Sequence, residues 1–355
     1  MHGTQTRRYP KDNLGRRIRG RRTPSGKRLI LQTRDIEIFK LLQRYRFLRS
    51  TYIWSLLPPE HRGKSFKRFQ DRLTDLFHET DTLHNGAYLD WPRQQRETYN
   101  ARYTASIYAL SSAGEALLED EDVQVNYLTD LVRSGRMAVN REFAHTMMIC
   151  DTLASIELGV QSEPNVRLVS WQEILAKAPK ETQQAGNPFA IPVEISHRFP
   201  NAATRTNERF RLTPDGLFGL EYALPTGKKV YRFFALEAER RNRVITSNLK
   251  GSSFLKKVLA YRTIIEKGIH TSHFGIPNLL ILTVAPTQAR IDTMKKMILG
   301  LYDAGDSSNF LFRCISTQGY DDQVDGPTSH MFHEPWQRAV LDDFRLVNTN
   351  TPALP

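Results

Sequence analysis

Acidic side chains lie at the ends of two neighbouring predicted strands in residues 212–239. Asp215 follows Pro214 on the first strand, and Glu237 and Glu239 end the second. Because side chains alternate along a strand, Glu237 and Glu239 share a largely apolar face, where carboxylates are costly to bury without a cation. Carboxylate and carbonyl oxygens suit Mg²⁺ or Mn²⁺. The sequence therefore predicts a hard-oxygen site at which the carboxylates of Asp215, Glu237 and Glu239 converge. Our working hypothesis is that Asp215 and Glu237 hold the metal, with the Ala238 carbonyl as a further ligand and Glu239 or Glu142 assisting.

A predicted helix after these strands carries a cationic group and a hydroxyl group. Lys257 and Tyr261 are four residues apart and share a helix face. Lys257 is the candidate cationic group, with Lys250 and Lys256 as weaker candidates. Tyr261 would be a hydroxyl partner or, as a second choice, a nucleophile that forms a DNA–protein link. Glu142, on an earlier predicted helix, is either a further acid of the site or a surface residue.

The two predicted strands and the following helix resemble the PD-(D/E)XK nuclease core. The resemblance lies in Pro214-Asp215, in Glu237-x-Glu239 and in the helix with Lys257 and Tyr261. The resemblance implies that the Asp and the Glu bind metal and that a Lys two residues after the Glu assists the attacking water. Glu239 occupies that Lys position, so Lys257 is expected to act from the helix instead. The alternative is a structural cluster in which the acids are paired with Arg240, Arg241 or Arg243.

The elements around these residues also follow the order of such a core. Residues 121–320 predict a helix, three strands, a helix, a strand, a helix and a strand. Residues 278–285, NLLILTVA, are typical of a strand covered on both faces. Residues 177–209 are expected to be mostly loop with some extended pieces. The extension 321–355 carries a short helix-like patch over 337–344, with disorder expected at its end.

Residues 29–120 predict the order helix, helix, helix, hairpin, helix, which is typical of a winged helix-turn-helix domain. The third helix, over residues 65–77, is apolar on one side and cationic on the other. It would enter the major groove of duplex DNA, while hairpin arginines contact the backbone or the minor groove. Protein contacts through the same fold are the alternative. The candidate DNA-binding residues are Lys64, Lys67, Arg68, Gln70, Arg72, Arg93, Arg96 and Arg102.

The first 28 residues form a basic arm in which only Asp12 is acidic. Such a segment cannot bury a core and is expected to be disordered alone. It would neutralise DNA phosphates, for example in a minor groove, and a solvated tail is the alternative. Its candidate DNA-binding residues are Arg16, Arg17, Arg19, Arg21 and Arg22.

Composition agrees with a polyanionic partner. The 355-residue chain has a formal net charge of +12, and proteins this basic commonly bind nucleic acid. Its two cysteines, Cys150 and Cys314, are far apart in sequence, which argues against a disulfide framework or a zinc site. No apolar run has transmembrane length, and the N-terminus lacks an apolar signal segment. We therefore expect a cytoplasmic protein.

Six runs between about residues 30 and 285 occur in an order that is shared with a known family. They are TRDIEIFKLLQRYRFL, IYALSSAGEALL, AHTMMICDTLA, TPDGLFGL, FFALEAER and FLKKVLAYR. Together with the combination of both predicted domains, they resemble the replication-relaxation family of plasmid and mobile-element proteins, and within it the MobC-type relaxases. The resemblance implies a protein that recognises an origin in duplex DNA and nicks one strand, with relaxosome or coupling proteins, or a second copy of the chain, as further partners.

Two other functions remain open from the sequence. One is a non-enzymatic origin-binding or regulatory protein whose nuclease-like domain is a scaffold, which Glu239 in the Lys position favours. The other is a DNA-end or phage-defence nuclease without origin preference. Metal binding and origin-dependent cleavage distinguish the three.

Overall fold

The computed structural model describes residues 20–95, 105–121, 140–198, 203–239, 249, 253–301, 308–315 and 327–347. The expected mixture of helices and strands is confirmed. Packing divides the chain into two units. The first is Met1–Ala154 with Tyr320–Pro327, and the second is Ser155–Gly319 with Thr328–Pro355.

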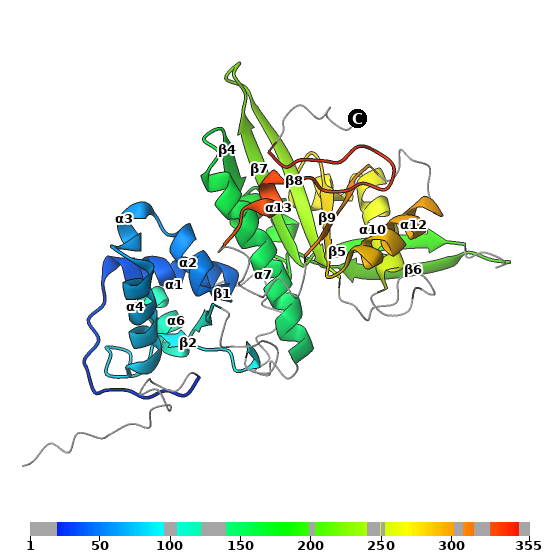
Figure 1. Cartoon of the computed structure of the whole chain (residues 1–355). Coiled ribbons are helices and arrows are strands. Elements are labelled where there is room, and N and C mark those ends of the chain that lie inside the picture. The colour runs from blue at the N-terminus through cyan, green and yellow to red at the C-terminus, as the bar shows by residue number, and fades with distance from the viewer. Residues whose placement is uncertain are drawn as a thin grey trace, which may run out of the picture. The chain divides into compact units, whose positions relative to one another are not determined.

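The first unit contains helices and a small antiparallel sheet of strand order β1-β3-β2. The three expected helices and the closing helix are present, and β1 and α3 are additional elements (Figure 1). The elements are α1 (Thr33–Tyr45), β1 (Leu48–Arg49), α2 (Ser50–Leu56), α3 (Pro59–Arg62), α4 (Phe66–His78), β2 (Leu89–Asp90), β3 (Ile107–Leu110) and α6 (Ser112–Asp120).

Local signals explain how these helices begin. Ser65 caps α4 by accepting a hydrogen bond from the Arg68 N–H. The N-cap of α1 is Gln32, whose backbone N–H donates to Asp35 Oδ2 at 2.8 Å. Residues 82–89, at the start of the predicted hairpin, are mostly turn. Thr82 Oγ1 donates to the Gly86 carbonyl at 2.7 Å, and only Leu89 enters β2.

Residues 20–28 were predicted as part of a disordered arm, and the structure corrects this. The Thr23 N–H donates to His78 Nδ1 at 3.0 Å, and the Ser25 N–H donates to Glu79 Oε2 at 2.9 Å. Lys27 forms an ion pair with Asp75. These polar contacts attach the segment to the C-terminal part of α4. Residues 1–19 lie outside the described part of the chain.

The helix α7 (Asn140–Gln161) contains the boundary between the units, whereas the sequence prediction started the second domain at residue 121. The difference has a physical cause in the packing of the first half of α7. Phe143, Met147 and Cys150 form one apolar cluster with Phe47, Ile107 and Ala109 of the first unit. The apolar face of α7 therefore completes the core of the first unit.

The second unit is built on a five-stranded sheet of order β10-β9-β8-β7-β4. Strands β4, β7 and β8 pair antiparallel, and β9 and β10 continue the sheet parallel to β8. Its elements are β4 (Val166–Val169), α8 (Trp171–Lys177), α9 (Lys180–Gln183), β5 (Ile191–His197), β6 (Thr206–Leu212), β7 (Gly216–Ala223), β8 (Lys229–Ala238), α10 (Phe254–Glu266), α11 (Ile269–Phe274), β9 (Leu280–Ala285), α12 (Gln288–Leu299), β10 (Phe310–Cys314) and α13 (His330–His333).

One face of this sheet forms the main apolar core. Phe233, Ala235 and Ile281 from the strands pack with residues of α8, α10, α11 and α12, among them Val258 and Ile291. The predicted strand in residues 278–285 is confirmed as β9, which is buried along its whole length. Helix α10 connects β8 to the parallel β9, as a crossover between parallel strands requires. This connection places one face of α10 over the end of β8.

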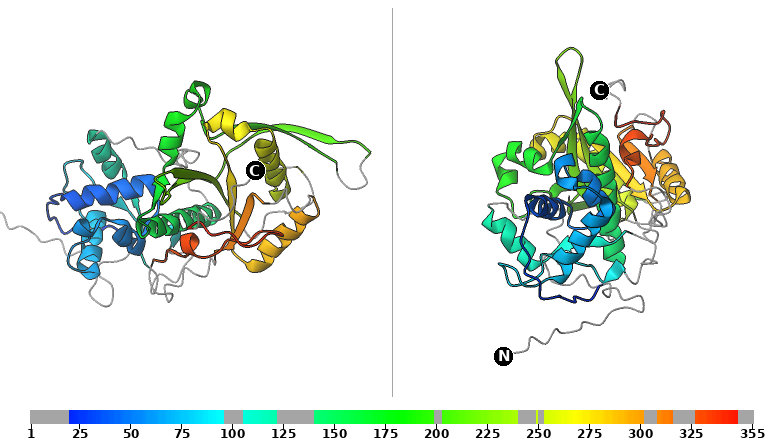
Figure 2. Two further views of the ribbon diagram at one scale, coloured as in Figure 1. Left: turned by 90° about the horizontal axis from the view of Figure 1, so that it is seen from above. Right: turned by 60° about the vertical axis from the view of Figure 1, so that its left-hand side comes forward.

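The polar stretch 177–209, predicted as mostly loop, contains α9 and most of an antiparallel β5–β6 hairpin. The hairpin residues pair from Ile191↔Leu212 to His197↔Thr206. Ile191, Val193 and Ile195 are buried in the main core, so this face packs on α10. Figure 2 (left) shows the hairpin extending outward from the second unit.

The C-terminal segment also differs from its prediction, because residues 337–344 form isolated bridges and bends rather than a helix. Trp336 pairs with Phe344, and Gln337 pairs with Phe312 of β10. The Trp336 ring is fully buried, and its Nε1 donates to the Met331 carbonyl at 2.8 Å. These long-range contacts hold the segment beside the sheet. Residues beyond 347 lie outside the described part.

Within the described residues, no helix combines the length and the apolar composition that a membrane crossing requires.

Candidate active site

The predicted acidic residues meet where β7 begins and β8 ends. The Asp215 N–H donates to the Leu236 carbonyl at 3.0 Å, and Asp215 Oδ2 accepts a hydrogen bond from the Ala238 N–H at 2.9 Å. Asp215 is half-buried, and its negative charge acts on Glu237. The turn between β7 and β8, with Gly227 at a φ of 77°, aligns the two strands as the sequence predicted.

Lys257 of α10 lies between the two glutamates of β8. Its Nζ donates to Glu237 Oε2 and, at 2.9 Å, to Glu239 Oε1. The Tyr261 hydroxyl, one helical turn later, donates to Glu237 Oε1 at 2.5 Å. We call Glu237, Glu239, Lys257 and Tyr261 the buried cluster, because the glutamates and the tyrosine are at most 1% exposed and Lys257 is 8% exposed. The expected four-residue spacing on α10 therefore brings both groups to the same carboxylate.

Burial dominates the protonation of this cluster. It raises the pKa of Glu237 to about 7, and the charge of Asp215 adds to the rise, although Lys257 opposes it. Burial alone would lower the pKa of Lys257, but the surrounding carboxylates outweigh it and the pKa is raised. Burial and Glu237 together raise the pKa of Tyr261 well above its ordinary value. Glu237 is therefore poised to take or release a proton near neutral pH, while Lys257 keeps its charge.

Two further side chains complete the site, and neither was identified from the sequence. Arg290, in the first turn of α12, has Nη2 3.5 Å from Glu239 Oε2. Thr283 of β9 pairs in register with Glu237, and its fully buried hydroxyl makes no hydrogen bond within the described residues. The signal for Thr283 was a polar residue in an otherwise apolar strand. Arg290 could be placed only after the parallel pairing of β8 and β9 was known.

The candidate DNA-binding residues of the first unit divide into exposed and engaged groups. Lys64, Arg68, Arg93 and Arg21 are exposed, Gln70 is half-buried, and Lys67 is exposed but forms an ion pair with Asp71. Arg72 and Arg22 instead form contacts with other residues of the first unit.

Arg72 and Arg22 connect α4 to neighbouring segments. Arg72 Nε donates to the buried Asp35 at 3.0 Å, and its Nη2 donates to the Ile30 carbonyl at 2.7 Å. The Arg22 guanidinium lies 4.7 Å from the centroid of the Phe77 ring and also contacts Asp90. Of the remaining candidates, the side chain of Glu142 and the whole of Arg16, Arg17, Arg19, Arg96 and Arg102 lie outside the described residues, as do Lys250, Arg240, Arg241 and Arg243.

Comparison with known proteins identifies the family. The profile described as replication-relaxation matches residues 39–280, which is more than half of the chain and includes α4, Asp215 and the buried cluster. The chain belongs to the replication-relaxation family. No curated protein and no solved structure matches it.

The donor set of this replication-relaxation protein fits a hard divalent cation in part. Within the described ranges, no three His, Cys, Asp or Glu side chains are grouped to hold a metal by themselves. Asp215 and Glu237 are close enough to interact electrostatically, and each carboxylate oxygen can accept more than one contact. Mg²⁺ is commonly held by one or two carboxylates together with waters and substrate phosphates. Two carboxylates therefore suffice if the substrate supplies the remaining oxygens.

Proposed function

We propose that this protein cleaves one strand of duplex DNA at the origin of a plasmid or mobile element, by metal-assisted phosphodiester hydrolysis. Family membership supports a role in replication or mobilisation of such an element. The observation that carries the chemistry is the arrangement of Asp215, Glu237 and Lys257 at adjoining ends of two strands and a helix. The element order of the second unit is compatible with the proposed PD-(D/E)XK-like core, and the element order of the first unit is compatible with the proposed winged helix, which would recognise duplex DNA.

Each residue has a role that its contacts support. Asp215, Glu237 and the Ala238 carbonyl would hold Mg²⁺ or Mn²⁺, which would lower the pKa of bound water and neutralise charge on the phosphate. Lys257 keeps its proton and would stabilise the phosphate's developing charge or orient the water. This ammonium also reaches Glu239, so a lysine from α10 can replace the one that the motif expects at Glu239. Tyr261 holds Glu237 in place, and its raised pKa makes it a poor nucleophile.

The test uses purified full-length protein, supercoiled DNA that carries the element's own origin, and Mg²⁺ or Mn²⁺. We expect conversion to the open circular form, and a loss of at least about 100-fold in Asp215→Ala and in Glu237→Ala. Glu221→Ala is the matched control, because Glu221 is a carboxylate on the same strand pair at its other end. The proposal is wrong if Asp215→Ala relaxes the plasmid as fast as the parent does.

A non-enzymatic origin-binding protein is the second candidate, and one observation favours it. Glu237 and Glu239 are almost completely buried and are neutralised by Lys257 and Arg290, as in a structural ion-paired cluster. Titration with Mn²⁺ distinguishes the two functions. A metal site binds Mn²⁺ and loses it in Asp215→Asn, whereas a structural cluster is indifferent to both.

A further inference from the structure

The β5–β6 hairpin has two faces of opposite character. Its inner face is fixed on α10 by the apolar residues of β5 and by Lys256, which pairs with Glu208 and lies 4.1 Å from the centroid of the Phe210 ring. Register pairing places Pro192 with Arg211 and Glu194 with Arg209 on the outer face. The hairpin is therefore attached to α10 by its inner face, and its outer face is exposed.

The outer face is exposed and strongly cationic. Each position that alternation assigns to it is exposed, including Arg198 and Arg205 beyond the last paired residues. Four arginines of this face are opposed by one acid, Glu194, whose Oε2 lies 3.0 Å from Arg209 Nε. Even in this pair the Arg209 side chain is 82% exposed. The face thus carries a net charge of +3 from four arginines and one glutamate.

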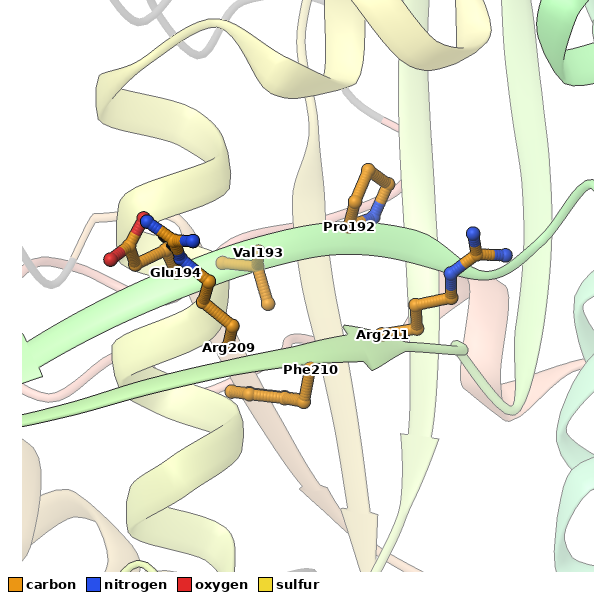
Figure 3. A pocket seen from close by; sticks show the side chains of 6 residues that line it. All are labelled: Pro192, Val193, Glu194, Arg209, Phe210 and Arg211. Atoms are coloured by element: carbon orange, nitrogen blue, oxygen red, sulfur yellow. Dashed lines mark ion pairs between the residues drawn. The ribbon is translucent and has the colours of Figure 1, made fainter.

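The chemistry of this face suits oxyanions such as phosphate. Arginine presents a planar fork of donors that binds phosphate oxygens in pairs. A hollow of about 450 Å³ lies against the hairpin, and Arg209 and Arg211 are among the residues that line it. In Figure 3 the heads of Glu194 and Arg209 meet, while Arg211 extends from the end of β6 away from Phe210. The hollow is lined by Pro192, Val193, Glu194, Arg209, Phe210 and Arg211.

The hairpin is also continuous with the candidate active site. Strand β6 ends at Leu212, three residues before Asp215, and the inner face packs on α10, the helix that carries Lys257. All of these residues belong to the second unit. A strand of DNA that passes over the arginines would thus be held by the same elements that position Asp215 and Lys257.

We propose that the outer face of the β5–β6 hairpin, through Arg205, Arg209 and Arg211, binds the phosphate backbone of duplex DNA next to the candidate active site. A two-stranded β-ribbon is narrow enough to enter the major groove of duplex DNA. The contacts that the arginines would make with phosphates position the DNA but do not read its sequence. The inference rests on the proposed DNA-cleaving function. It assigns to the second unit a DNA contact separate from the winged helix.

The first experiment measures binding of the full-length protein to a duplex of unrelated sequence in EDTA, as a function of salt. Each phosphate contact contributes about 0.9 to the slope of log K against log salt. We expect the slope to fall by roughly 2 to 3, and the affinity at 0.1 M salt to fall at least about tenfold, in the triple variant Arg205→Gln, Arg209→Gln, Arg211→Gln.

The matched control removes the same charge from exposed lysines elsewhere in the second unit. These lie on the β7–β8 turn, after α10 and on α12. The control triple, Lys228→Gln, Lys267→Gln, Lys296→Gln, should keep the parent slope. Equal slopes in the two triples, or tighter binding to a single strand of the same length than to the duplex, would overturn the inference.

A second experiment does not depend on residual affinity or on the stability of the triple variant. A photo-crosslinking amino acid at Asn207, an exposed outer-face position between Arg205 and Arg209, should crosslink to DNA. The same group at Lys296 should not. DNA crosslinks at Lys296 alone, or at neither position, would contradict the proposed surface.

Both experiments are done without metal, so they are independent of cleavage. Loss of binding in the hairpin triple, together with a parent protein that never cuts, would support the hairpin and refute the nuclease. Unchanged binding in the hairpin triple, together with cleavage that depends on Asp215, would refute the hairpin contact and support the nuclease.

Discussion

Two acid–base clusters lie on the same sheet face at opposite ends of β7 and β8, and they behave in opposite ways. In the buried cluster, burial raises the pKa of Glu237 to about 7. At the other end, Glu221 accepts hydrogen bonds from Lys229 Nζ at 2.7 Å and Arg167 Nη2 at 2.9 Å, and the pKa of Glu221 falls to about 2. Tyr231 also donates to Glu221 at 2.9 Å. We call Glu221, Arg167, Lys229 and Tyr231 the rim cluster.

The two clusters contain the same kinds of residue, so residue type does not explain the difference. The cations of the rim cluster are about half exposed, at 49% for Arg167 and 57% for Lys229, whereas the Lys257 side chain is 11% exposed. Hydrated cations can pair with Glu221 at little cost, while every charge in the buried cluster has lost its water. The difference in exposure to water therefore explains why the pKa of Glu237 is raised and the pKa of Glu221 is lowered.

Removal of the lysine from each cluster should give the largest difference in the free energy of unfolding. Lys257→Met leaves two glutamates buried without their nearest cation and should lower the free energy of unfolding by about 3–5 kcal/mol. Lys229→Met removes one exposed partner and should leave stability close to that of the parent. Urea unfolding, followed by circular dichroism, measures both. Comparable losses would mean that burial is not what distinguishes the clusters.

The pH dependence of stability should have opposite signs at the two ends. Glu237 has a pKa raised from about 4.5 to about 7, so the folded state holds a proton that the unfolded state releases. Its contribution is present below pH 4.5 and is lost as the pH rises through 7, on the order of 3 kcal/mol. Glu221 has a lowered pKa, so its contribution is present above pH 4.5 and is lost as the pH falls toward 2.

Unfolding in EDTA across this range tests the signs. Glu237→Gln should flatten the profile between pH 4.5 and 7, and Glu221→Gln should flatten it below pH 4.5. If Glu237→Gln changes only the acid limb, the assignment of the raised pKa is wrong.

The two tyrosines allow a smaller comparison. Tyr261→Phe removes a buried hydrogen bond to Glu237 and should cost about 1–3 kcal/mol. Tyr231→Phe removes an analogous bond to Glu221, whose other partners are accessible to water, and should cost less. Cleavage by Tyr261→Phe should persist, because the proposed reaction uses water as its nucleophile. Complete loss of cleavage with stability retained would favour a covalent tyrosine intermediate.

The smallest effect is expected at Thr283. Its hydroxyl is buried next to Glu237 without a hydrogen bond in the described residues, so Thr283→Val should change the free energy of unfolding by less than about 1 kcal/mol, or raise it. The melting temperature measures this. A clear destabilisation would indicate that the hydroxyl has a partner, such as a buried water, that belongs to the site.

Much of the buried cluster could be predicted because its signals are local. The adjacency of Asp215 and Glu237 follows from a hairpin with a tight turn, and the shared face of Lys257 and Tyr261 follows from helical periodicity. Arg290 could not be predicted, because its contact with Glu239 depends on how α12 crosses a sheet built from distant segments.

The β5–β6 hairpin was missed for a different reason. Ile191, Val193 and Ile195 do alternate, but a polar composition around them favoured a loop, and only packing on α10 explains the burial of one face. The C-terminal segment shows the same limit, because its pairing with β10 joins residues that are distant in sequence. Local sequence patterns thus predicted the elements next to the buried cluster. They did not predict elements whose structure depends on contacts between residues that are distant in sequence.

The pairing of Gln337 with Phe312 has a consequence for assembly. The two residues exchange backbone hydrogen bonds of 2.8 and 2.9 Å along the outer side of β10, the last strand of the sheet. An open strand edge is a template for pairing with another chain, and here the protein's own tail occupies part of it. Strand addition by a second molecule would first have to displace that tail, so self-association through β10 is disfavoured, and removal of residues 328–355 should promote aggregation.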